Sequence, residues 1–182
     1  MKNKARQILF ITVTVFFFCS CKKEMPPMLP PITDTGANTF GCLVDGKVWL
    51  PGADPFGFIR PKEWYYSSQY FYMHFSNTKG DADDYLNLIF YPVSHDTTII
   101  IKNTPDTTYP HPHPEFLFDR YYNKGSFYDH FAPVNQYSGQ MTFTKFDTVN
   151  YIFSGTFWFD AVDTVTGKVV HVTEGRFDLG TL

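Results

Sequence analysis

The sequence predicts an all-β protein, an antiparallel β-sandwich or barrel of roughly 8–10 short strands. Aromatic residues make up 19% of the chain, and Phe and Tyr account for most of them. Such residues favour strands. Beyond the N-terminus, no segment of about ten residues repeats its apolar positions with the helical period of 3.6. Short apolar segments instead alternate with Gly, Pro, Asn and Asp, as in antiparallel sheets.

The N-terminus, residues 1–20, is predicted to be a signal peptide. Lys2, Lys4 and Arg6 precede an apolar run over residues 8–18 that is interrupted by two threonines. The run has the length of a signal-peptide core, about 7–15 residues, and is shorter than the about 20 residues that span a bilayer. No later run is as long, so we expect no transmembrane helix in the mature chain.

The end of this run resembles the lipobox of bacterial lipoproteins, in which a small residue precedes the cysteine that is lipidated. Ser20 is small enough to precede the cut and Phe18 is not, so Cys21 rather than Cys19 is the expected lipid-attachment site. The resemblance implies a diacylglycerol thioether and an acyl chain such as palmitate on the new amine. Several chains hold a domain on a membrane, here expected to be the outer membrane, in either leaflet. An ordinary secreted protein and an uncleaved anchor are the alternatives.

The mature chain is predicted to hold a tether, residues 21–38, and one all-β domain, residues 39–182. Four prolines between positions 26 and 31 exclude a helix and favour polyproline II. Loss of the three basic signal residues changes the formal net charge from −3 to −6. This balance does not favour nucleic acid as a partner. Cys42 would be the only cysteine besides Cys21, so we expect no intrachain disulfide and a buried thiol.

Ten segments have the pattern of strands. Turn residues separate them at Asp45-Gly46, Asn123-Lys124-Gly125, Asp147-Thr148 and residues 163–167. Residues 116–122 could also form a short helix after Pro114. The expected strands are residues 40–44, 47–50, 69–75, 85–91, 97–101, 116–122, 126–131, 141–146, 150–161 and 168–179.

The two ends of the domain resemble a family of small Bacteroidota lipoproteins that have no assigned function. The similarity lies in ANTFGCLVDGKVWLP at residues 37–51 and in FSGTFWFDAVDTVTGKVVHVTEGRFD at residues 153–178. It implies a lipoprotein of the cell envelope with a β fold and brings no activity. The motifs themselves are structural in type: Trp49 is an apolar anchor, and two glycines, Gly155 and Gly175, leave room beside Phe157 and Phe177.

The stretch EWYYSSQYFY, residues 63–72, supplies the candidate ligand face. Tyr and Trp rings have flat apolar faces on which sugars stack, and polar tips that form hydrogen bonds. We therefore expect a non-catalytic module that binds a glycan or a protein partner; the alternative is that these aromatic residues form the core of a purely structural or assembly protein. The candidate residues are Trp64, Tyr65, Tyr66, Tyr70 and Tyr72.

No catalytic residues, metal or cofactor are predicted. HPHPE at residues 111–115 has two histidines, and GDADDY at residues 80–85 has three aspartates, but neither completes a known metal-binding pattern. The sequence has no G-x-S-x-G, H-E-x-x-H or phosphate-binding loop. A hydrolase with an unrecognised site remains the third alternative.

Four Asp-Thr pairs resemble the O-glycosylation acceptor motif of Bacteroidota, in which the Thr after Asp carries the sugar. The alternative is that Asp and Thr form local hydrogen bonds in turns. The candidate acceptors are Thr97, Thr107, Thr148 and Thr164.

Overall fold

A computed structural model of the chain describes residues 27–53, 60–90, 98–102, 115–122, 127–134 and 137–181. Within these ranges the regular structure is all β, as predicted, and no helix long and apolar enough to cross a membrane is present. The strands are β1 (Thr39–Val44), β2 (Lys47–Trp49), β3 (Lys62–Tyr66), β4 (Phe71–Asn77), β5 (Ala82–Phe90), β6 (Thr98–Lys102), β7 (Glu115–Tyr122), β8 (Phe127–Phe131), β9 (Ser138–Asp147), β10 (Ile152–Val162) and β11 (Val169–Leu179).

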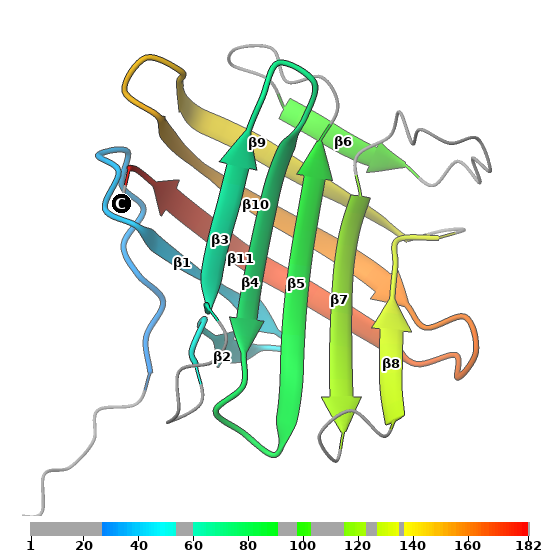
Figure 1. Ribbon diagram of the computed structural model, residues 1–182. Helices are drawn as coiled ribbons and strands as arrows, with labels where there is room; N and C mark the ends of the chain where they lie inside the picture. Colours follow the sequence, from blue (N-terminus) through cyan, green and yellow to red (C-terminus); the bar gives the residue numbers. More distant parts are fainter. Residues whose placement is uncertain are drawn as a thin grey trace, which may run out of the picture.

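The strands form two antiparallel sheets that pack face to face. The six-stranded sheet has the order β2-β1-β11-β10-β9-β6, and the five-stranded sheet has the order β3-β4-β5-β7-β8. Figure 1 shows the five-stranded sheet in front, with the strands of the other sheet crossing behind it at an angle. Among the described strands, each edge strand (β2, β6, β3 and β8) pairs within its sheet on one side only, so the fold is a sandwich and not a barrel.

One strand, β3, was not among those predicted from the sequence. Its residues pair with β4 from Lys62 opposite Phe75 to Tyr66 opposite Phe71. A tight turn joins the two strands, because Ser67 Oγ accepts hydrogen bonds from the backbone N–H groups of Gln69 and Tyr70, both at 3.2 Å. The sequence pattern missed β3 because this turn lies inside a continuous aromatic stretch.

The predicted hairpins are present. Asp45 and Gly46 have φ values of 50° and 75°, the left-handed conformation that a two-residue hairpin turn requires. Strands β7 and β8 pair from Phe118 opposite Phe131 to Tyr122 opposite Phe127. The strand prediction for residues 116–122 is therefore confirmed, and the helical alternative is wrong.

Phenylalanine dominates the core between the sheets. Phe40 of β1 stacks on Phe75 of β4 with ring centroids 3.5 Å apart, and Phe153 of β10 lies 4.8 Å from Phe71 of β4. Burial of each such side chain contributes about 1.5–3 kcal/mol. Cys42 is fully buried among them, as predicted, and burial raises the pKa of its thiol far above the usual range.

Two glycines make room for two of these rings across the β10–β11 pair. Gly155 lies opposite Phe177, and Gly175 lies opposite Phe157, two positions apart in the register and on the same face of the sheet. A Cβ at Gly155 would clash with the backbone oxygen of Thr142 and lie 2.8 Å from the Phe177 ring, and one at Gly175 would lie 2.6 Å from the Phe157 ring. Either change would displace a buried ring, so each glycine provides space for the phenylalanine on the opposite strand.

The end of the predicted tether is docked onto the sandwich. The buried Asp178 of β11 accepts hydrogen bonds from Thr33 Oγ1 at 2.6 Å, from the N–H of Gly36 at 2.7 Å and from the N–H of Ala37 at 3.1 Å. Ser154 Oγ of β10 donates another at 2.7 Å. Residues 33–37 are therefore a fixed part of the domain surface.

Candidate functional site

The outer face of the five-stranded sheet carries part of the candidate ligand face. Strand alternation divides the five predicted residues between the two faces of the sheet. Trp64 and Tyr66 point inward and contact Phe153, with ring centroids 5.4 and 5.2 Å away. Tyr65 and Tyr72 lie opposite one another on the outer face, and the Tyr70 ring is 5.5 Å from that of Tyr65.

A row of rings continues from Tyr72 across this outer face, and we call it the aromatic row. The ring centroids of successive members are 6.3, 5.8, 5.4 and 5.2 Å apart. The row crosses four neighbouring strands, which at about 4.8 Å per strand spacing gives it a width of about 14 Å. Its members are Tyr72, His74, Tyr85, Tyr121 and Tyr128.

Polar side chains are interleaved with these rings. The amide oxygen of Asn87 lies 2.7 Å from His74 Nδ1 and accepts a bond from the Tyr72 hydroxyl at 3.4 Å. Beside Tyr121, His130 Nδ1 lies 2.6 Å from Asp119 Oδ1. This hydrogen bond raises the pKa of His130, so the pair orients the imidazole and favours its charged form.

Three tyrosines of the row, Tyr72, Tyr85 and Tyr121, have raised pKa values and keep their protons at neutral pH. Burial and the nearby Glu63 raise the pKa of Tyr72, and burial, Asp83 and Tyr121 raise that of Tyr85. The pKa of Tyr121 is raised in the same way. Each of these three phenols is therefore a neutral hydrogen-bond donor at the rim of an apolar ring.

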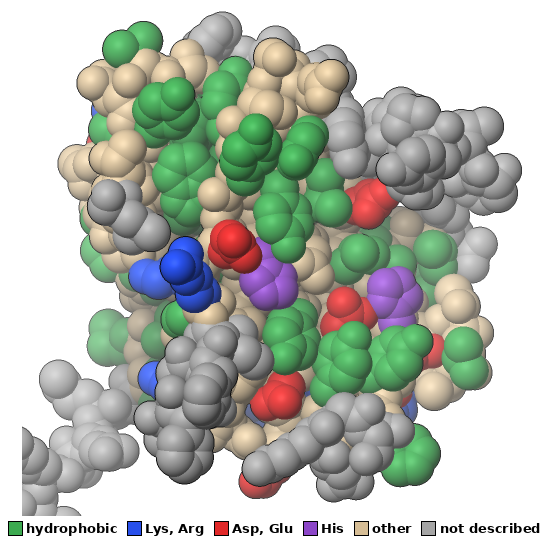
Figure 2. Space-filling model, in the orientation of Figure 1, with side chains coloured by type: hydrophobic (Ala, Val, Ile, Leu, Met, Phe, Trp, Pro, Cys, Tyr) green, Lys and Arg blue, Asp and Glu red, His purple; other side chains and the backbone are tan. Residues whose placement is uncertain are grey.

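Figure 2 shows this face from outside. Hydrophobic side chains, Tyr among them, spread over it, and histidine and acidic side chains lie between them. Tyr65 is 53% exposed and Tyr128 is 60% exposed, one near each side of the sheet. The face therefore offers rings and hydrogen-bonding groups to solvent together.

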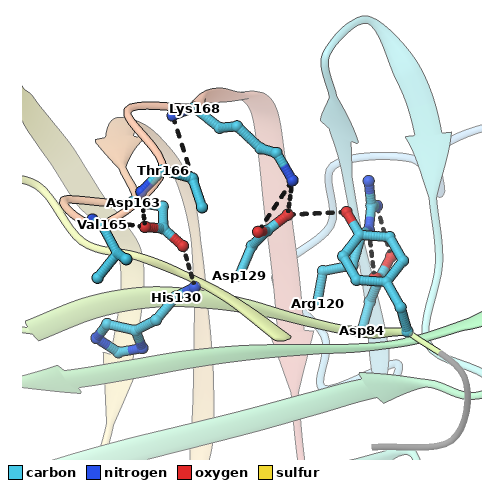
Figure 3. A network of polar contacts seen from close by, with 9 residues as sticks. Asp84, Arg120, Asp129, His130, Asp163, Val165, Thr166 and Lys168 are labelled. Atoms are coloured by element: carbon cyan, nitrogen blue, oxygen red, sulfur yellow. Dashed lines mark hydrogen bonds and ion pairs between the residues drawn. The ribbon is translucent and has the colours of Figure 1, made fainter. Parts of the chain in front are cut away.

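A polar network anchors the end of β5 and β7 below this face (Figure 3). The buried Asp84 of β5 accepts two hydrogen bonds from Arg120 of β7, at 2.7 and 2.8 Å. Trp49 Nε1 of β2 donates to the same carboxylate at 3.1 Å, which links the two sheets. Asp84 therefore lies in β5, and its charge is satisfied by structural partners on β2 and β7.

The second half of the network holds β8. Lys168, in the turn before β11, donates to both oxygens of the buried Asp129 at 3.0 and 2.7 Å. The Tyr122 hydroxyl donates to Asp129 Oδ2 at 2.9 Å, and the ammonium of Lys168 lies 5.6 Å from the Tyr122 ring centroid. These contacts fix the two strands that carry Tyr121 and Tyr128.

Two of the four candidate glycosylation sites lie in the described residues, and both occupy turns of the same geometry. Asp147 Oδ1 accepts from the N–H groups two and three residues on, at 3.0 and 2.9 Å. Asp163 Oδ1 does the same at 2.8 Å for both. Thr164 is exposed and Thr148 is half-buried. The Asp of each pair therefore forms the turn and leaves the following Thr at its outer side.

Several predicted positions lie outside the described residues, namely Cys21, Thr97, Thr107 and residues 111–114. In the part of the chain that the structure describes, no group of three or more His, Cys, Asp or Glu side chains is arranged to hold a metal ion.

Sequence reasoning missed the far half of the aromatic row. Tyr85, Tyr121 and Tyr128 were all placed on predicted strands, with Tyr85 opposite in phase to the core residue Leu86. Nothing in the sequence showed that β5 pairs with β7, because β6 crosses to the other sheet between them. The alternation of buried and outward residues could have shown which tyrosines point outward. It could not have shown which strands lie side by side.

Comparison with known proteins adds no relative: no protein-family model, curated protein or solved structure matches the chain.

Proposed function

We propose that the protein is a lipid-anchored protein of the cell envelope whose β-sandwich binds a glycan without catalysis. The basic start, the short apolar run and Ser20-Cys21 support the signal peptide and the lipid at Cys21, hence a membrane as the first partner. The resemblance of the two domain ends to Bacteroidota lipoproteins supports the outer membrane as the location.

The aromatic row is the observation that carries the binding proposal. Its rings present apolar faces and edges along about 14 Å of the outer sheet surface, which suits an extended ligand better than a single ring. The flanking Asn87 amide, the His130–Asp119 pair and the tyrosine hydroxyls supply donors and acceptors for sugar hydroxyls. A purely structural sheet face needs no such alternation of half-buried and exposed rings with oriented polar groups.

The test is a glycan-array and pull-down screen with the purified protein and its Tyr121→Ala variant. Tyr121 lies between Tyr85 and Tyr128 in the row, so we expect its loss to weaken glycan binding about 10-fold. Tyr151→Ala is the matched control, because Tyr151 is 47% exposed but lies in the turn between β9 and β10 of the other sheet.

Unchanged glycan binding by the Tyr121→Ala variant, or no glycan bound by either protein, would refute the glycan proposal. Capture of a protein that depends on Tyr121 and not on Tyr151 would favour the protein-partner alternative.

We also propose that Thr148 and Thr164 carry O-linked glycans. Their support is the acceptor-like Asp-Thr-Val sequence and the position of both threonines in turns at the surface of the domain.

A further inference from the structure

A hollow on the outer face of the six-stranded sheet lies on the opposite side of the sandwich from the aromatic row. It has a volume of about 620 Å³, including space that is open to solvent. Strands β9, β10 and β11 form its floor, and Ile32 of the docked N-terminal segment contributes to its wall. Trp158 of β10 lines it and is 40% exposed, whereas Trp49 is 4% exposed.

The strand register sets two levels of cross-strand neighbours on the floor of the hollow. At one level, Trp158 lies opposite Gln140 of β9. Two residues along β10, Thr156 lies between Thr142 of β9 and Arg176 of β11. One flat aromatic ring is thus surrounded by an amide, two hydroxyls and a guanidinium.

A β-bulge in β11 completes the site. The pairing of β10 with β11 shifts around Trp158, so that Thr173 and Glu174 together stand opposite this one residue. Glu174 has a φ of 50°, an uncommon conformation for a residue other than glycine. Bulges of this kind re-aim side chains and are frequent beside binding sites. The bulge places the Glu174 side chain at the hollow.

The charges at the hollow cancel each other. Arg176 Nη2 donates to Glu174 Oε2 at 3.1 Å, and Arg176 Nε donates to the Glu174 carbonyl at 3.1 Å. Arg176 Nη1 also donates to the Pro30 carbonyl at 3.4 Å. An anionic ligand would have to displace an intramolecular carboxylate, whereas a neutral ligand with hydroxyl groups can add hydrogen bonds to both side chains.

We propose that this hollow is a second binding site, which takes one sugar ring of a neutral saccharide. The apolar face of the sugar stacks on Trp158. Its hydroxyl groups bond to Gln140, Thr142, Thr156 and the Glu174–Arg176 pair. The site is separate from the aromatic row, since the two lie on the outer faces of different sheets, and it does not depend on that proposal.

The test uses tryptophan fluorescence, because Trp158 is the most exposed of the three tryptophans. Iodide quenches exposed tryptophan, so a bound sugar should protect Trp158 from it. The probes are maltose, lactose, cellobiose and N,N′-diacetylchitobiose at millimolar concentrations, where a Kd of about 1 mM corresponds to about −4 kcal/mol. We expect protection by at least one of them.

Binding is then measured by calorimetry on variants whose urea midpoints match that of the wild type. Gln140→Ala keeps Trp158 and should weaken binding about 5-fold, the effect of one lost hydrogen bond. Trp158→Ala should weaken it at least 10-fold. Tyr121→Ala, on the other sheet, should leave it unchanged.

Three results would overturn the proposal: no protection by any of the four sugars, binding restricted to an anionic sugar such as sialyllactose, or wild-type affinity in Trp158→Ala. Binding that is lost in Tyr121→Ala and retained in Trp158→Ala would refute this site and support the aromatic row instead. Binding that is weakened only in Trp158→Ala and Gln140→Ala would support this site, whatever the glycan screen shows for the aromatic row.

Discussion

Asp178 holds the N-terminal segment on the sandwich, and Asp178→Ala is expected to lower the free energy of unfolding by about 4 kcal/mol. The residue is 1% exposed, and its carboxylate accepts hydrogen bonds at 2.6–3.1 Å from Ser154 and from four residues of the segment, Thr33, Thr35, Gly36 and Ala37. All of these donors are neutral, and a hydrogen bond to a charged group contributes about 1.5–3 kcal/mol, so the loss of several of them together is expected to cost about 4 kcal/mol. That is a large part of the about 5–15 kcal/mol that stabilises a domain.

The assay is urea unfolding followed by tryptophan fluorescence. Ser154→Ala and Thr33→Val each remove one hydrogen bond to Asp178 and should cost about 1 kcal/mol. Hydrogen exchange at the N–H groups of Gly36 and Ala37 should accelerate in Asp178→Ala, because these groups lose their acceptor. A loss of less than about 1 kcal/mol in Asp178→Ala would refute the argument that this carboxylate fixes the segment.

The same contact predicts a pH dependence. Burial by itself would raise the pKa of Asp178, but the bonds from Thr33, Ser154 and the N–H groups of Ala37 and Gly36 outweigh it and hold the pKa well below its usual range. An unfolded Asp ionises near pH 3.9. The stabilisation is therefore complete above about pH 4 and is lost as the pH falls further, because only the unfolded chain then takes up the proton. Asp178→Asn should remove this part of the acid sensitivity.

Three further predictions concern other parts of the chain. Gly155→Ala should destabilise the domain by about 1–3 kcal/mol in urea unfolding, since its Cβ would clash with the backbone oxygen of Thr142 and crowd Phe177. Gly80→Ala, whose Cβ would approach no atom closer than 3.8 Å, should stay within about 0.5 kcal/mol, and equal effects would contradict the packing argument. Cys21→Ala should move the protein out of the membrane fraction, whereas Cys19→Ala should not, and identical fractionation would count against the lipobox. The intact mass of protein from the native host should exceed the summed mass of lipid and polypeptide, and the excess should be smaller in Thr164→Ala. A mass equal to that sum would exclude the glycans.

The predicted strands follow from local chemistry, whereas their arrangement does not. Alternation and turn residues are read within a few positions, and a turn such as Asp45-Gly46 needs φ values that its own residues supply. The bond between Thr33 and Asp178 joins residues that are 145 positions apart. Proline at positions 30 and 31 excludes helix whether the segment is free or docked, so sequence alone could not reveal the docking.

Only the part of the aromatic site that is local in sequence could be predicted. Tyr65, Tyr70 and Tyr72 are close in sequence, and a β-turn brings the first of them beside the second. Tyr121 reaches the row only because β7 pairs with β5. Strand alternation places Trp158 on the face of β10 opposite to the buried Phe157 and Phe159, but the bulge in β11 that brings Glu174 beside it was not visible in the sequence.

The docked segment also limits how far the domain can stand from the membrane if Cys21 carries the lipid. Nine residue steps separate Cys21 from Pro30, whose carbonyl is held by Arg176, and a fully extended chain covers about 30 Å in that number. A free tether up to Thr39 would reach about twice as far. Because Ile32 lies at the hollow around Trp158, the anchored end of the chain leaves the domain beside that hollow and not beside the aromatic row. The row on the opposite sheet is therefore the surface that the anchor leaves freer for a large extended ligand, and the hollow suits a smaller one.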